Sequence, residues 1–326
     1  MPIEPTPKDV LFRDGTAQVY RFRQTRDAGG PAPKPGGMPV LLVPSMINRW
    51  YVLDLRPGAS LSRALVDEGL DTWCLDWGIP QDEDRYLSWD DVQDRLSRVV
   101  RFLRRATGAP KVGILGYCMG ATLSGIFTAT HAADVAAFVN LAGPFDFSQG
   151  GLLSTMVDRR WFDVDAVADA GNVAPSQMQD GFVALRPTQP WSKIIAKMET
   201  AFDPKARASF EALDEWASDN IPFPASAYRT YIRELYQQNG LMTGEHRVRG
   251  KRVDLANITC PVLTVAAERD AICPLPAARA LNERCGTTDH ELIVVPGGHV
   301  GAVVGSKASK VLYPAISNWL RRKLCN

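Results

Sequence analysis

The chain reads Gly116-Tyr117-Cys118-Met119-Gly120 between a short apolar run and a helix-forming segment. The run over Lys111–Leu115 suits a buried parallel strand, and residues 121–129 have the pattern of a helix. A turn of the form Gly-x-nucleophile-x-Gly between a strand and a helix is typical of a nucleophile elbow, so Cys118 is a candidate nucleophile. Since a thiolate leaves more readily than an alkoxide, a cysteine here favours acyl transfer between a thiol and a hydroxyl over simple ester hydrolysis.

Length and composition indicate one large folded domain, or one domain with a sizeable insertion. The 326 residues are 45% hydrophobic and 22% charged, with a net charge of +1. Such a balance implies neither nucleic acid nor an anionic membrane as a partner. The six cysteines show no CxxC pair and no metal-ligand spacing, so we expect reduced thiols, no metal and a cytoplasmic setting. With no signal-like start and no membrane-spanning run, we expect a soluble, unprocessed chain with no transmembrane segment.

Alternating strand and helix patterns predict an α/β fold with a mostly parallel sheet flanked by helices. An antiparallel opening strand is expected over Gln18–Phe22. Further strands are expected over Pro39–Pro44, Asp71–Asp76, Lys111–Leu115, Val135–Leu141, Pro261–Ala266 and Glu291–Val295, and helices over Leu61–Glu68, Trp89–Ala106, Pro276–Cys285 and Tyr313–Lys323.

The alternation stops between Phe145 and Gly250, where the chain is helical in pattern and punctuated by prolines. We predict a mainly helical cap over residues 145–250, inserted between two parts of the core at residues 1–144 and 251–326. Its apolar and aromatic residues either line an acyl tunnel or pack a small core of their own. They include Trp161, Phe162, Phe182, Trp191 and Phe202.

Three chemically capable residues follow predicted strand ends: Cys118, Asp270 and His299. Catalytic groups gather at the carboxyl ends of strands in a doubly wound sheet. The order nucleophile, acid, histidine matches the α/β-hydrolase arrangement and predicts that fold. His299 is the expected base for the Cys118 thiol. Asp270 either orients the imidazole and stabilises its charged form, or helps it activate a substrate hydroxyl.

Other residues compete for these roles or have structural interpretations. Asp146, which also follows a strand, and Asp76 are alternative acids. We interpret the remaining cysteine and histidine candidates as structural, namely Cys74, His131, His246 and His290.

An oxyanion hole would use the backbone amide of Met119, at the positive end of the elbow helix. A second amide would come from the loop Pro44–Asn48, in which Pro44 has no N–H to offer. Met46 is the predicted donor and Ile47 the alternative; an ordinary strand-to-helix turn would also explain this loop.

Four stretches together resemble the polyhydroxyalkanoate synthases of the α/β-hydrolase superfamily. They are Leu41–Pro57, Leu75–Gly78, the cysteine elbow and Tyr228–Asn239. The segment Asn48–Pro57 beside a cysteine elbow is far more specific than the elbow alone, and the resemblance runs from about Val40 to the C-terminal helix. The short N-terminal part resembles the catalytic subunit of the two-component class III or IV enzymes.

This resemblance implies that Cys118 is acylated, that Asp270 is the acid and that His299 is the base. The family passes (R)-3-hydroxyacyl units from coenzyme A to the thiol and then to a chain-end hydroxyl, so it implies polyester synthesis, with 3-hydroxybutyryl-CoA as the expected substrate and no cofactor. It also implies a homodimer through the cap, a second synthase subunit and a place at the surface of a cytoplasmic polyester granule. Two positions depart from the family pattern: Ala121 stands for a second glycine of the elbow, and Ala271 for a histidine after the acid.

Two other functions fit the same residues. A cysteine-dependent thioesterase or esterase would release coenzyme A without polymer, because water replaces the chain-end hydroxyl. A non-catalytic granule-associated paralogue would keep the fold without acylating Cys118. Arg49 and Arg56 either meet the phosphates of coenzyme A or are simply solvated.

Overall fold

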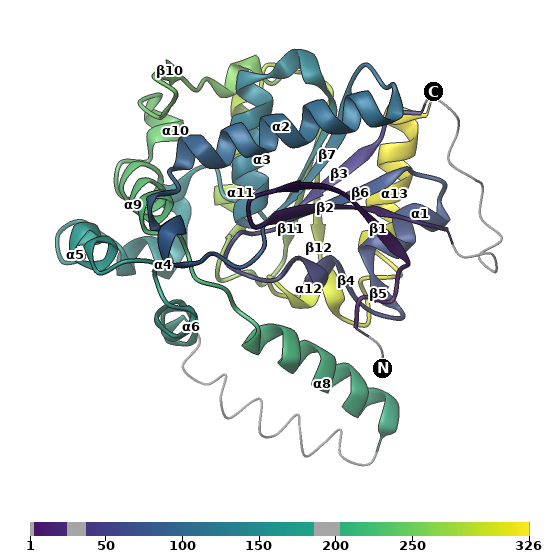
Figure 1. Ribbon diagram of the computed structural model, residues 1–326, viewed down its shortest axis with the longest axis horizontal. Coiled ribbons are helices and arrows are strands. Elements are labelled where there is room, and N and C mark those ends of the chain that lie inside the picture. Colours follow the sequence, from purple (N-terminus) through teal and green to yellow (C-terminus); the bar gives the residue numbers. More distant parts are fainter. Residues whose placement is uncertain (1–2, 25–36, 186–202, 326) are drawn as a thin grey trace.

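The computed structural model describes residues 3–24, 37–185 and 203–325. Its centre is an eight-stranded sheet in the order β1-β2-β6-β3-β7-β8-β11-β12 (Figure 1). Strand β2 pairs antiparallel with both β1 and β6, and every neighbouring pair from β6 to β12 is parallel. The strands are β1 (Lys8–Asp14), β2 (Ala17–Phe22), β3 (Val40–Val43), β6 (Thr72–Asp76), β7 (Val112–Tyr117), β8 (Val135–Leu141), β11 (Val262–Ala267) and β12 (His290–Val295). The predicted α/β fold with a mostly parallel sheet is confirmed.

Helices cover both faces of this sheet because successive strand residues point to opposite sides. In β3, Leu41 and Val43 belong to one apolar cluster, whereas Val40 and Leu42 belong to the other. Helices α2 (Trp89–Thr107), α3 (Met119–Thr130) and α11 (Leu275–Arg284) complete the first cluster, and α1 (Leu61–Asp67) and α13 (Leu312–Leu324) the second (Figure 1). The carboxyl ends of the parallel strands are thereby held in fixed positions.

The stretch between β8 and β11 adds no strand to the large sheet in the part of the chain that the structure describes. It forms α4 (Gly151–Met156), α5 (Val164–Asp169), α6 (Pro175–Ala184), α8 (Pro204–Ser218), α9 (Ala225–Thr230), the π-helix η5 (Tyr231–Gln237), α10 (Gly240–Thr243) and a small hairpin, β9 (Arg247–Val248) and β10 (Lys251–Arg252). The cap boundaries at 145 and 250 stay predictions. Trp191, Phe202 and the Phe182 side chain lie outside the described part of the chain.

Short elements complete the fold. They are η1 (Trp50–Leu53), β4 (Asp54–Arg56), β5 (Ala59–Ser60), η2 (Asp82–Tyr86), η3 (Ala132–Asp134), η4 (Phe147–Gln149), η6 (Leu255–Asn257) and α12 (Gly301–Val304).

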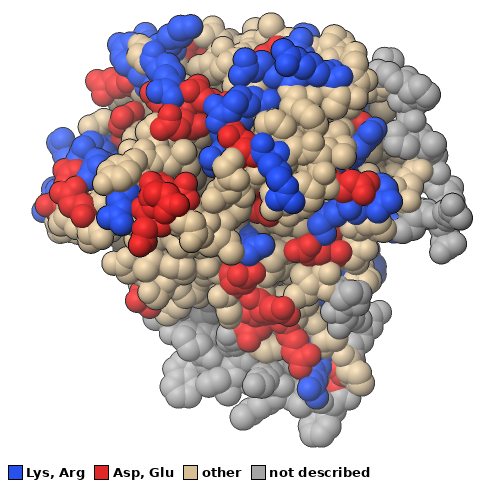
Figure 2. Space-filling model, viewed as in Figure 1, with Lys and Arg blue, Asp and Glu red and all other residues tan. Residues whose placement is uncertain are grey.

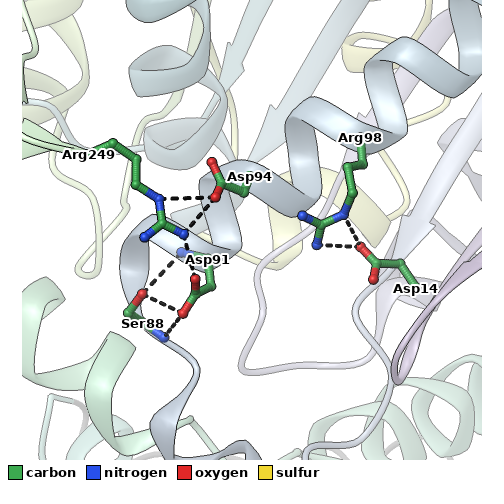
Figure 3. A network of polar contacts seen from close by, with 6 residues as sticks. All are labelled: Asp14, Ser88, Asp91, Asp94, Arg98 and Arg249. Atoms are coloured by element: carbon green, nitrogen blue, oxygen red, sulfur yellow. Dashed lines mark hydrogen bonds and ion pairs between the residues drawn. The ribbon is translucent and has the colours of Figure 1, made fainter.

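Polar contacts join helix α2 to the β9–β10 hairpin and to the end of β1 (Figure 3). At its start, Ser88 and Asp91 form a capping box, which satisfies amide groups that the first turn would otherwise leave unpaired. Arg249, in the turn of the β9–β10 hairpin, binds Asp91 and Asp94 at 2.6 Å each. Further along, Arg98 pairs with Asp14 at the end of β1. The end of the predicted cap is therefore anchored to a core helix.

Charged side chains of both signs are interspersed on the face seen in Figure 2. Many charged side chains of the described residues are paired, as in the contacts of Asp165 with Arg229 at 2.8 Å and with Arg233. Surface pairs of this kind contribute little to stability individually.

Candidate active site

Cys118 lies in a sharp turn between β7 and α3. Its backbone has φ 57° and ψ −129°, a conformation that costs energy for a residue with a side chain and that recurs at functional sites. The turn can be this tight because its flanking residues are glycines. A Cβ atom on Gly116 would lie 2.3 Å from Cα of Ala121, and one on Gly120 would lie 2.1 Å from the carbonyl oxygen of Val43. The two glycines therefore permit the turn that presents the partly exposed Cys118 side chain.

Asp270 and His299 come from the turns after the neighbouring strands β11 and β12. Nδ1 of His299 lies 2.7 Å from Oδ2 of Asp270, and both side chains are buried. The other carboxylate oxygen accepts hydrogen bonds from the backbone amides of Ile272, at 2.8 Å, and Cys273, at 2.9 Å. With Oδ1 held by two amides, Oδ2 is directed at the imidazole, and the proton on Nδ1 is fixed there.

The other ring nitrogen of His299, Nε2, is available to interact with the Cys118 thiol. Nε2 is buried and has no completed hydrogen bond with any described protein atom, yet the Cys118 sulfur lies close enough to influence its charge. Burial opposes a charge on His299, but the negative charge of a Cys118 thiolate and the hydrogen bond that His299 donates to Asp270 raise the pKa of His299 to about 10. The surroundings of His299 thus favour an imidazolium beside the Cys118 sulfur.

Tyr117 packs against His299 and holds its loop, a role that the sequence did not predict. Its ring stacks on the His299 ring with centroids 5.4 Å apart, and its hydroxyl donates to the His299 carbonyl oxygen at 3.4 Å. Its place directly before the nucleophile was the one available signal. Stacking and hydrogen bonding together hold the loop that carries the base.

The loop after β3 lies against the first turn of α3. Gly120 lies so close to the Val43 and Pro44 carbonyl groups that a Cβ atom there would clash with both. Met119 is the first residue of the helix, where backbone N–H groups have no intrahelical acceptor. The Ile47 amide donates to Oγ of Ser45 at 3.4 Å. Of the two loop amides considered, this favours Met46 as a donor beside Met119; both roles stay predictions.

The structure gives the competing acids and histidines other partners. Asp146 accepts a hydrogen bond from Asn239 at 2.9 Å, and Asp76 accepts from Tyr20 at 3.0 Å. The histidines pair elsewhere: His131 stacks on Phe127 at 4.4 Å, His246 lies 2.8 Å from Glu234, and His290 lies 3.3 Å from Asn282. Of the candidates, Asp270 and His299 alone contact each other beside Cys118.

A cavity of about 590 Å³ opens from Cys118 between the core and the helices of residues 145–250. Its described lining is mainly apolar: Ile47, Cys118, Met119, Leu153, Met156, Val157, Trp161, Phe162, Val167, Val173, Gln177, Met178, Gly181, Phe223, Tyr228, Tyr231, Ile232, Tyr236 and Ile272. From the sequence, Trp161 and Phe162 could either line an acyl tunnel or pack a small core of their own; in the structure both line this cavity. A thioester bound here would be shielded from water on its acyl side.

The stretch Asn48–Pro57 holds helix α8 and the residues after it. Trp216 donates to the Arg49 carbonyl oxygen at 2.9 Å, and Tyr51 donates to Asp219 at 2.8 Å. The Arg49 guanidinium also lies 3.9 Å from Asp219, while Arg56 donates to the carbonyl of Pro57 at 3.3 Å. The two arginines thus have intramolecular partners, and this stretch anchors one edge of the cap.

The departure at Ala121 is accommodated by a neighbouring glycine. Ala121 is fully buried, and a Cβ atom on Gly143 would lie 2.3 Å from its methyl carbon. The methyl group therefore occupies space that the absence of a side chain at Gly143 provides. Ala271 is partly exposed next to Asp270 and supplies no hydrogen-bonding side chain there.

Among the described residues, no group of three or more histidine, cysteine or acidic side chains could hold a metal ion. A search of the same residues finds no helix with the length and apolar character needed to cross a membrane.

Comparison with known proteins identifies the class first. A family model described as "alpha/beta hydrolase fold" matches residues 39–306, and the chain belongs to that family. It is 33% identical over 322 residues to the poly(3-hydroxyalkanoate) polymerase subunit PhaC of Allochromatium vinosum, covering 98% of this chain and 89% of that protein. The PhaC subunit of Thiocystis violacea is 30% identical, with 98% and 89% covered. The chain therefore belongs to the poly(3-hydroxyalkanoate) polymerase PhaC family, and the predicted resemblance is confirmed.

Solved structures show the same fold at low identity. A putative lipase from Sulfolobus solfataricus superposes with a TM-score of 0.58 at 13% identity, covering 97% of this chain and 99% of that one. A thermophilic esterase from Thermogutta terrifontis gives 0.57 at 14% identity, with 98% and 99% covered. At this distance the likeness shows the fold alone.

Proposed function

We propose that this chain is an acyltransferase that polymerises (R)-3-hydroxyacyl-CoA, 3-hydroxybutyryl-CoA among them, into polyhydroxyalkanoate. Membership of the PhaC family supports the reaction. The observation that carries the proposal is the elbow cysteine beside a buried Asp270–His299 pair, at the mouth of an apolar cavity. A thiol nucleophile suits a step in which a thioester is exchanged for another thioester and then for an ester.

In the first step, Nε2 of His299 holds the proton of Cys118, and the thiolate attacks the thioester carbonyl carbon. A bond from Sγ to that carbon forms, the bond to the coenzyme A sulfur breaks, and His299 returns the proton to the departing thiolate. The amides of Met119 and Met46 are the proposed donors to the oxyanion.

In the second step, His299 takes the proton of a chain-end hydroxyl. The hydroxyl oxygen attacks the acyl carbon on Cys118, an ester bond forms, the carbon–sulfur bond breaks and the proton passes to the cysteine sulfur. Asp270 stabilises the imidazolium in both steps through Nδ1, so its two predicted roles use the same hydrogen bond.

We further propose that the chain forms a homodimer through the cap, works with a second synthase subunit and resides at the granule surface in the cytoplasm. Two apolar side chains near the cavity support a contact on this side: Leu152 is 51% exposed and Trp161 57% exposed. Exposed large apolar groups at one place commonly mark interaction surfaces.

The test is release of coenzyme A from (R)-3-hydroxybutyryl-CoA by the wild-type protein and by Cys118→Ala, with the product assayed as polyester after methanolysis. Release with polymer, lost in Cys118→Ala, is the expected result. Release with only free hydroxy acid would identify a thioesterase instead. No release and no acyl label on Cys118, with longer acyl chains and a synthase partner subunit supplied, would favour the non-catalytic paralogue.

A further inference from the structure

The cavity beside Cys118 offers few groups that can hydrogen-bond a substrate. Among its described lining side chains, these are the Cys118 thiol, Gln177, the indole N–H of the largely exposed Trp161, and three tyrosines, Tyr228, Tyr231 and Tyr236. The Gln177 side chain is oriented by its Oε1, which accepts from the Ala174 amide at 3.0 Å at the start of α6 and leaves only its NH₂ group for a ligand. The tyrosine hydroxyls are therefore the principal polar groups offered to an acyl chain.

Two of these tyrosines share a face of the helix only because that helix is of the π type. Tyr231 and Tyr236 are the first and sixth residues of η5 (Tyr231–Gln237). Residues five apart in an α-helix point about 140° away from each other. In a π-helix the hydrogen bond joins residues i and i+5, so the same two side chains lie on adjacent turns of one face. Both consequently line the cavity, with ring centroids 5.4 Å apart.

Both tyrosines lie within electrostatic reach of the nucleophile. Burial raises the pKa of Tyr231 and Tyr236 well above the usual value, and the charge of Cys118 raises both further. The Tyr228 hydroxyl differs, because burial alone raises its pKa, to about 12. Tyr231 and Tyr236 thus remain protonated at neutral pH and can donate hydrogen bonds close to Cys118.

The two rings are held by aromatic neighbours. Tyr231 stacks on Trp89 with centroids 5.4 Å apart, and Tyr236 packs edge-on against Phe147 at 4.7 Å. Groups fixed in this way lose little freedom when they bind a ligand, so their hydroxyls are preorganised.

We propose that the Tyr231 and Tyr236 hydroxyls bind the 3-hydroxyl oxygen of the acyl group that enters Cys118, and that they select 3-hydroxyacyl thioesters over unsubstituted acyl thioesters. This inference rests on the proposed function. The two hydroxyls also hydrogen-bond each other, so one buried donor of the pair is free for the ligand. An acyl group without the hydroxyl would leave that donor unpaired, whereas a purely apolar cavity would accept both kinds of chain. The π-turn in the stretch Tyr228–Asn239 is the feature that assembles this specificity site.

The experiment compares (R)-3-hydroxybutyryl-CoA with butyryl-CoA as acyl donors in the first turnover. Coenzyme A release and acyl-Cys118, followed by intact-protein mass spectrometry, give a rate constant for each donor. The variants are Tyr231→Phe, Tyr236→Phe and the double substitution, with Tyr228→Phe as the matched loss of a hydroxyl from the same cavity. We expect the wild type to prefer the hydroxylated donor, and the double variant to lose about tenfold of that preference.

The ratio of the two rate constants separates specificity from structure. A general disturbance of the cavity would slow both donors alike and leave the ratio unchanged, and that result in the double and both single variants would overturn the proposal. A ratio that falls equally in Tyr228→Phe would also overturn it. If the wild type acylates Cys118 from neither donor, the proposed function itself fails, which is distinguishable from an unchanged ratio in an active enzyme.

Discussion

Nδ1 of His299 lies 2.7 Å from Oδ2 of Asp270, although the two residues are 29 positions apart in the chain. The contact forms because β11 and β12 are adjacent and parallel, so the turns at their carboxyl ends meet. It is also buried, with the second oxygen of Asp270 held by two backbone amides. The carboxylate therefore cannot turn away from the imidazole without breaking those two bonds.

Asp270→Asn is expected to keep this geometry and lose the charge. An amide stabilises the imidazolium far less than a carboxylate and can present its NH₂ group to Nδ1, so the imidazole would carry its proton on the wrong nitrogen. We expect the rate of coenzyme A release from (R)-3-hydroxybutyryl-CoA to fall by about 10³-fold or more.

The matched control is Asp146→Asn, at the acid that also follows a strand and whose partner is Asn239. It should retain a rate within a few-fold of the wild type. A large loss in Asp146→Asn with little change in Asp270→Asn would reverse the assignment of the acid.

The proton on His299 depends on its two neighbours. Burial would lower the pKa of His299, but the Cys118 thiolate and then Asp270 raise it to about 10. Nuclear magnetic resonance of ¹⁵N-histidine should therefore show both ring nitrogens protonated at pH 7.5, and Cys118→Ala should move the pKa of His299 downward. Because the folded-state pKa exceeds that of free imidazole, about 6.5, the stabilisation from this group is complete below about pH 6.5. It is lost as the pH rises through about 10. A neutral ring at pH 7.5 in the wild type would contradict this charge state.

The parallel strands were predictable because buried strands appear in the sequence as short apolar runs. The end of β7 was placed too early, at Leu115, because Gly116 and Tyr117 are less distinctive in composition; in the structure they pair with Asn140 and Leu141 of β8. Strand β1 was missed, since its side chains are mostly exposed or half-buried on both faces and give no alternation to recognise. Sequence patterns report burial, and an edge strand has little of it.

The sequence identified the candidate residues of the site but not which of them contact each other. Cys118, Asp270 and His299 each follow a strand, but so does Asp146, and the sequence does not say which strands are neighbours. The sheet order settles which side chains meet, because it places β12 beside β11. The π-turn that brings Tyr231 and Tyr236 to one face has no compositional signature, since it depends on one added residue in a helical turn.

Gly120→Ala should disrupt the elbow. The new methyl carbon would lie 2.1 Å from the Val43 carbonyl oxygen and 2.5 Å from that of Pro44, both of them backbone atoms that cannot rotate away. We expect the free energy of unfolding in urea to fall by about 1–3 kcal/mol, with loss of acylation at Cys118. Gly301→Ala, at a position with no atom within 4 Å of the added carbon, should change stability little. Equal stability of the two variants would show that the elbow can relax.

Tyr51→Phe should loosen helix α8 without altering the elbow. The tyrosine hydroxyl donates to Asp219 at 2.8 Å, just after the helix, while the bond from Trp216 to the Arg49 carbonyl remains. Loss of one such hydrogen bond costs about 1 kcal/mol, which should appear as faster hydrogen exchange over residues 204–218. Tyr86→Phe is the control, because Tyr86 is 79% exposed. Unchanged exchange in Tyr51→Phe would mean that this bond does not hold the helix.

Val167→Trp should shorten the acyl chains that the enzyme accepts. Val167 lines the cavity of about 590 Å³ from α5 and is only partly buried, so a larger side chain there can extend into the cavity without displacing the core. A 3-hydroxybutyryl group would fill only a small part of the cavity. A 3-hydroxyoctanoyl group has four more carbon atoms and needs correspondingly more apolar volume. Because methylene-sized differences in a hydrophobic pocket change selectivity by about tenfold or more, we expect kcat/KM for (R)-3-hydroxyoctanoyl-CoA to fall about tenfold relative to (R)-3-hydroxybutyryl-CoA.

Leu292→Trp, on the exposed edge strand β12, provides the same added bulk away from the cavity and should leave this ratio unchanged. If Val167→Trp lowered kcat/KM equally for both thioesters, the cavity would not be the acyl site. The substitution would then be acting on the position of the helices that cover Cys118, and the acyl chain would have to leave the nucleophile by another route.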